Sequence, residues 1–107
     1  MAVDLLIVGS PTQQGRELAS LKILLDAVPE NGLKDKKVAA FDTRHKWRWL
    51  RIWGFAATSL AESLKTKGGD LIVPPEAFLV ESTKGPLLQG EIERAAAWAR
   101  DLAGKIT

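Results

Sequence analysis

The stretch Leu5-Leu6-Ile7-Val8-Gly9-Ser10-Pro11-Thr12 decides the fold that we expect for this chain. Its first half, Leu5–Val8, is a run of apolar residues that would place large side chains on both faces of a strand. A strand that is covered on both faces is typical of a parallel sheet with helices above and below it. The second half favours a turn at the carboxyl end of that strand, where ligands bind in open α/β sheets. The stretch therefore predicts a buried strand that leads into a candidate ligand-binding loop.

The rest of the chain alternates between predicted helices and predicted strands. Predicted strands span Lys37–Asp42, Asp70–Val73 and Ala77–Val80, and Pro74-Pro75 separates the last two because proline cannot donate to a sheet ladder. The predicted helices are a segment ending near Pro29 and the turn Asn31-Gly32, a segment from about Trp49 to Lys67 that stops at Gly68-Gly69, and Glu91–Lys105. The two segments on either side of the prolines count as one interrupted strand, so the order of elements is β-α-β-α-β-α. This order predicts an α/β protein with a parallel sheet of three main strands, whose first two helices share one face.

Apolar residues at helical spacing indicate which face of each helix is buried. The expected stripes are Leu18, Leu21, Leu24, Leu25 and Val28 in the first helix, Trp53, Ala56, Ala57, Leu60 and Leu64 in the second, and Ile92, Ala95, Ala96, Ala99, Leu102, Ala103 and Ile106 in the third. We also expect Trp98, which lies beside the third stripe, to serve in packing.

The composition predicts one small domain that spans residues 1–107. Apolar residues make up 46% of the chain and charged residues 26%, and the net charge is +2, all ordinary values for a globular protein. The net charge is too small to imply nucleic acid, and no apolar run approaches the ~20 residues of a membrane span. The chain contains no cysteine and a single histidine, so we expect no metal site, and we expect a cytoplasmic setting without a targeting segment.

Five segments resemble the flavodoxin family in their order and spacing. They are DLLIVGSPT from Asp4, KVAAFDTR from Lys37, WLRIWGFAA from Trp49, PPEAFLVES from Pro74 and GPLLQGEIERAAAWAR from Gly85. The resemblance is closest to flavodoxin-like proteins with a D-T-R turn after the fourth strand. It implies that the three strands correspond to the third, fourth and fifth of a three-layer 2-1-3-4-5 sheet, truncated at its amino-terminal part.

The resemblance also implies a cofactor, flavin mononucleotide (FMN), and a role as an electron carrier rather than an enzyme. Two loops would flank the flavin ring: Ser10, Pro11, Thr12, Gln13, Gln14 and Gly15, and Asp42, Thr43 and Arg44 with Trp47 nearby. The family holds the FMN phosphate in a hydroxyl- and glycine-rich loop after its first strand, and nothing in this sequence replaces that loop. We therefore expect FMN binding that is weak or absent.

Each of these candidate residues has a simpler interpretation. Ser10–Gly15 can be an ordinary connection between a strand and a helix, and Asp42 and Thr43 can cap the segment that follows them. Arg44 can face the pyrimidine edge of a flavin or a neighbouring carboxylate. The residues alone leave these alternatives open.

The stretch 44–53, RHKWRWLRIW, is the most unusual in the chain because it holds four cationic side chains and three tryptophans. One interpretation is a helix entry in which Trp49 and Trp53 are buried and Trp47 is exposed. The alternatives are stacking on a flavin, docking of an acidic redox partner, and, less favoured, nucleic-acid binding. A flavin-free interaction or structural module that uses this stretch is the alternative function.

The absence of the family's first strand predicts an assembly. The strand Leu5–Val8 would have an open edge, and part of one sheet face would lack its helix. We therefore expect a homodimer, either through the joined Leu5–Val8 edges or through helices that are exchanged to cover the bare faces.

Overall fold

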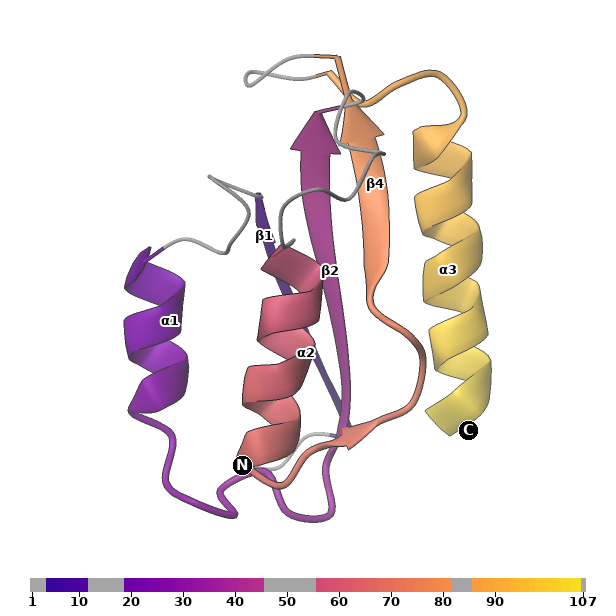
Figure 1. The fold of residues 1–107 in the computed structure, drawn as a ribbon. Coiled ribbons are helices and arrows are strands. Elements are labelled where there is room, and N and C mark those ends of the chain that lie inside the picture. Colours follow the sequence, from indigo (N-terminus) through magenta and orange to yellow (C-terminus); the bar gives the residue numbers. More distant parts are fainter. Residues whose placement is uncertain (1–3, 12–18, 46–55, 82–85, 107) are drawn as a thin grey trace.

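The computed structural model describes residues 4–11, 19–45, 56–81 and 86–106, which form an α/β fold of four strands and three helices (Figure 1). The strands are β1 (Leu5–Pro11), β2 (Lys37–His45), β3 (Asp70–Leu71) and β4 (Glu76–Val80). The helices are α1 (Ala19–Asp26), α2 (Ala56–Thr66) and α3 (Glu91–Ile106). The predicted order of strands and helices is thus confirmed for the part of the chain that the structure describes.

Strand β2 is the centre of the sheet, with β1 on one side and β3 followed by β4 on the other. All three ladders are parallel, and β1 pairs with β2 from Leu5↔Lys37 to Pro11↔Thr43. The chain leaves the ladder between β3 and β4, at the two prolines, as predicted, although β3 ends at Leu71 rather than Val73.

Helices α1 and α2 pack on one face of the sheet and α3 on the other (Figure 1). The first face holds the larger core cluster, in which the fully buried Leu60 and Leu64 of α2 pack with Val38 and Ala40 of β2. Helix α2 ends at the predicted place, where Gly68 has a φ of 97° and its N–H donates to the carbonyl oxygen of Lys65 at 3.0 Å.

The predicted apolar stripe of α3 is right for Ala95, Leu102 and Ile106 and wrong for its other members. The buried side of the helix runs through Ala95, Trp98 and Leu102, whereas Ile92 is 69% exposed, and Ala96, Ala99 and Ala103 are exposed as well. Trp98 determines this orientation because its ring packs edge-on against Phe41 and Phe78, with 5.8 Å between centroids in both pairs. A tryptophan buries far more apolar area than an alanine, so burial of Trp98 contributes more stabilising free energy than burial of the alanine row would. The packing role expected for Trp98 is confirmed.

The expectation that β1 is buried on both faces holds for Leu5, Leu6 and Val8, which pack against the two core clusters, but not for Ile7. Ile7 is 42% exposed, because α3 covers the sheet over β2 and β4 but not over this residue of β1. The strand also continues beyond Val8 through Gly9 and Ser10 to Pro11, where we expected a turn. It stays extended because the ladder to β2 continues through Gly9↔Phe41 to Pro11↔Thr43. The position requires glycine because the ring of Phe41 lies over it, and a Cβ atom there would come within 2.1 Å of Phe41 Cζ.

Helix α1 buries only part of its predicted stripe. Leu25 is 5% exposed, and Leu21 and Val28 pack against the same core, but Leu24 is 64% exposed. Leu18 lies outside the described residues. None of the described helices is long and apolar enough to span a membrane.

Candidate functional site

The carboxyl ends of β1 and β2 bring the two predicted loops together. The register places Ser10 opposite Asp42 and Pro11 opposite Thr43. Alternation along a strand then divides these residues between the two faces of the sheet. Ser10 and Asp42 face α1 and α2, and Pro11 and Thr43 lie on the side of α3.

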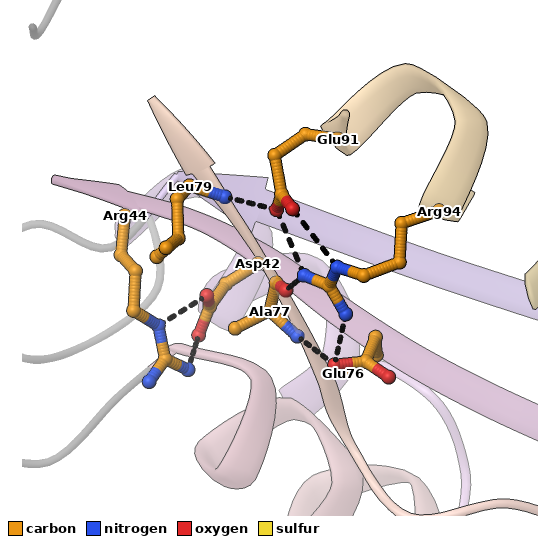
Figure 2. A network of polar contacts seen from close by, with 7 residues as sticks. All are labelled: Asp42, Arg44, Glu76, Ala77, Leu79, Glu91 and Arg94. Atoms are coloured by element: carbon orange, nitrogen blue, oxygen red, sulfur yellow. Dashed lines mark hydrogen bonds and ion pairs between the residues drawn. The ribbon is translucent and has the colours of Figure 1, made fainter. Parts of the chain in front are cut away.

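Asp42 and Arg44 form an ion pair on the α2 side of the sheet (Figure 2). Arg44 Nε donates to Asp42 Oδ1 at 2.8 Å and Arg44 Nη2 donates to Asp42 Oδ2 at 2.7 Å. Asp42 is fully buried and Arg44 is 9% exposed. Because both side chains lie on one face of β2, two residues apart, the pair follows from strand geometry alone.

Asp42 also connects β2 to the start of α2. The backbone N–H of Ala57, in the first turn of that helix, donates to Asp42 Oδ2 at 2.9 Å. The N–H groups of a first turn lack partners within the helix, and a carboxylate there also interacts favourably with the helix dipole. The structure therefore favours the capping interpretation of Asp42 and the carboxylate-facing interpretation of Arg44.

The remaining described candidates differ in exposure. Ser10 is 4% exposed, and its hydroxyl donates to the carbonyl oxygen of Pro11 at 2.8 Å. Pro11 is exposed and Thr43 is half-buried. Of the described candidates, Pro11 and Thr43 present the most accessible surface at this edge.

Several candidates lie outside the described residues. They are Thr12, Gln13, Gln14, Gly15 and Trp47, together with Trp49 and Trp53 of the tryptophan-rich stretch. Their roles stay predictions from the sequence.

A second polar network joins α3 to the outer edge of β4 (Figure 2). Arg94 donates through Nε and Nη2 to the two carboxylate oxygens of Glu91 at 2.9 and 2.8 Å, and its Nη1 lies 3.0 Å from Glu76 Oε1. The backbone N–H of Leu79 donates to Glu91 Oε2 at 2.8 Å, and Arg94 donates to the carbonyl oxygen of Ala77. Side chains of α3 thus satisfy backbone groups on an edge that would otherwise be open.

The ion pair changes the acidity of both partners. The hydrogen bonds from Arg94 lower the pKa of Glu91 below its ordinary value, against the opposing effect of burial. The same contact with Glu91 raises the pKa of Arg94. The Arg94 guanidinium also lies 4.8 Å from the centroid of the Phe78 ring, where a cation–π interaction adds to the attachment of α3.

Sequence reasoning left the contacts of Asp42 and Arg44 as alternatives and missed the Glu91–Arg94 network, although each pair has a sequence signal. Opposite charges at i and i+2 of a predicted strand share a face, which indicates the Asp42–Arg44 pair. Opposite charges at i and i+3 of a predicted helix indicate Glu91–Arg94. The bonds to Leu79, Ala77 and Ala57 carry no such local signal because they join segments far apart in the sequence.

The described residues contain no group of three or more His, Asp or Glu side chains that could hold a metal ion. Comparison of the sequence with family models and with curated proteins gives no match. The fold and the carboxyl edge of the sheet are therefore the basis on which a function is proposed.

Proposed function

We propose that this chain is a flavodoxin-like protein in which FMN binding is weak or lost. The observation that supports this most is the Asp42 carboxylate, whose oxygens accept hydrogen bonds from Arg44 and from the N–H of Ala57. Asp42 and Arg44 are residues that the family resemblance assigns to the surroundings of a flavin ring. Because they are buried and bonded within the protein, a ligand would have to break these bonds to use them.

The phosphate group of FMN gives a second reason for weak binding. A phosphate monoester carries about two negative charges at neutral pH, and burying such a group without partners costs more than stacking at ~1–3 kcal/mol per aromatic contact can offset. The sequence lacks a phosphate-loop pattern. Ring contacts alone would therefore leave FMN only weakly attached.

The alternative function is a flavin-free interaction or structural module. Both hypotheses use the same fold, and they differ in whether any flavin occupies the edge formed by Pro11 and Thr43. An acidic redox partner fits either hypothesis, since Lys46, Arg48 and Arg51 supply positive charge in the tryptophan-rich stretch even with Arg44 directed inward.

Titration of the protein with FMN, followed by quenching of flavin fluorescence, tests the proposal. Riboflavin is the matched probe because it has the same ring without the phosphate. We expect both ligands to bind more weakly than micromolar and FMN to bind no more tightly than riboflavin. A sub-micromolar dissociation constant for FMN, with much weaker riboflavin binding, would contradict the proposal because it requires a built phosphate site.

A further inference from the structure

The two outer edges of the sheet are protected very differently. On β4, the N–H of Leu79 donates to Glu91 and the carbonyl oxygen of Ala77 accepts from Arg94. Among the described residues, β1 has β2 as its only strand neighbour. Within the part of the chain that the structure describes, the open edge of the sheet is therefore that of β1.

The hydrogen bonds of β2 determine which backbone N–H and C=O groups of β1 point away from β2, toward the open edge. The carbonyl oxygen of Val38 accepts from Ile72 N–H at 3.2 Å, so Val38 faces away from β1. Alternation then turns Ala39 toward β1, where its Cα partner is Ile7. In a parallel ladder a residue bonds to the two neighbours of its partner, so Ile7 itself faces outward. The outward-facing backbone groups of β1 belong to Leu5, Ile7, Gly9 and Pro11, of which Pro11 offers only its carbonyl oxygen.

Apolar side chains flank this edge on both faces of the sheet. Ile7 is 42% exposed on the α3 side, and Leu24 of α1 is 64% exposed on the other side. At about 100° per residue, Leu24 lies on a flank of α1 beside the buried face of Leu21 and Leu25, whereas Ile23, which is 71% exposed, lies on the side opposite that face. Residues Leu5–Pro11 include no charged side chain that would discourage the addition of a strand.

We propose that the edge of β1 is the interface through which two copies of this chain form a two-fold dimer with antiparallel β1 strands. Both copies present the same edge with the same outward-facing residues, and two-fold pairing of such edges is antiparallel. In the proposed register the two-fold axis passes between the Val8 residues of the two copies. Ile7 of one copy then lies opposite the partner's Gly9. In each copy the ring of Phe41 covers Gly9, so Ile7 meets an apolar surface there.

The size of the contact favours a second copy over an isolated strand. Stable interfaces bury about 1,200–2,000 Å² in total, more than seven residues of strand edge supply. The two-fold axis runs perpendicular to the joined sheet, so both α1 helices lie on the same face beside each other. Leu24 of each copy then faces the dimer axis, and the helices add area to the strand contact. This interface forms whether or not a flavin binds.

Sedimentation velocity across a dilution series of the full chain tests this assembly. We expect a dimer at micromolar concentration, and we expect Leu24→Lys to weaken it about tenfold or more, because two like charges meet near the axis. Ile23→Lys is the matched control: it adds the same charge to the next residue, on the outward side of α1, and is expected to leave the dimer intact. Circular dichroism confirms that both variants fold, since both side chains are already exposed. A monomeric parent protein, or equal dissociation constants for the two variants, overturns the proposal.

Discussion

Arg44 binds Asp42 through two parallel hydrogen bonds of 2.8 and 2.7 Å, and the same carboxylate accepts the N–H of Ala57 at 2.9 Å. One buried carboxylate thus joins the central strand to the start of α2. The pair lies at the carboxyl end of the sheet, where the family resemblance places a flavin, and it serves the protein's own structure there.

Removal of one partner of this pair is expected to be strongly destabilising. Asp42→Ala leaves a buried guanidinium and a helix N–H without their acceptor, and we expect a loss of about 3–5 kcal/mol in the free energy of unfolding. Denaturant unfolding measures it. The double variant Asp42→Leu with Arg44→Met replaces both charges by apolar groups, and we expect a loss well below the sum of the two single changes. Additive losses would show that the two side chains are not energetically coupled.

The Glu91–Arg94 pair predicts a pH-dependent stability. The hydrogen bonds from Arg94 make the pKa of Glu91 lower in the folded chain than in the unfolded chain. The ionised carboxylate therefore stabilises the fold above the unfolded pKa, and this contribution disappears as the pH falls through the folded pKa.

Glu91→Gln is accordingly expected to lower the free energy of unfolding by about 1–2 kcal/mol at pH 7, with a difference that narrows below about pH 4. Thermal or denaturant unfolding at several pH values measures this. Glu93→Gln, an exposed position in the same helical turn, is the control and should have little effect at any pH. A loss that stays constant across the pH range would exclude an ionic role for Glu91.

The close approach of Phe41 to Gly9 predicts a steric effect. Gly9→Ala places a methyl group where the Phe41 ring lies, and we expect a loss of about 1–3 kcal/mol in the free energy of unfolding. Phe41→Leu in the same chain should relieve part of the clash, so that the double variant loses less than the sum of the single changes. Gly104→Ala is the control because open space surrounds that position within α3, and there alanine should be neutral or stabilising.

The sequence predicted the order of the elements because their apolar spacing and their glycine and proline boundaries are local signals. It failed for α3, where counting apolar residues favoured the row of Ile92 and the alanines. The aromatic contacts of Trp98 with Phe41 and Phe78 decide the orientation, and these residues are far apart in the sequence. It failed for Gly9 for a similar reason: this residue is paired with the distant strand β2, and it is a glycine because the ring of Phe41 leaves no room for a side chain.

The candidate site was predictable in position and less so in role. Parallel strands deliver their carboxyl ends to one edge, so the loops that begin at Ser10 and Asp42 were expected at the same edge, and these two residues lie opposite each other. Whether Asp42 faces a ligand or the protein depends on the start of α2, which supplies Ala57 from a distant part of the chain.

The absorption spectrum of the protein as purified, before and after unfolding to release any bound molecule, tests the central proposal most directly. A flavodoxin-like chain that binds FMN weakly or not at all is expected to show no visible flavin absorption at a ratio near one per chain. Flavin absorption at about one FMN per chain, retained through purification, would contradict the account.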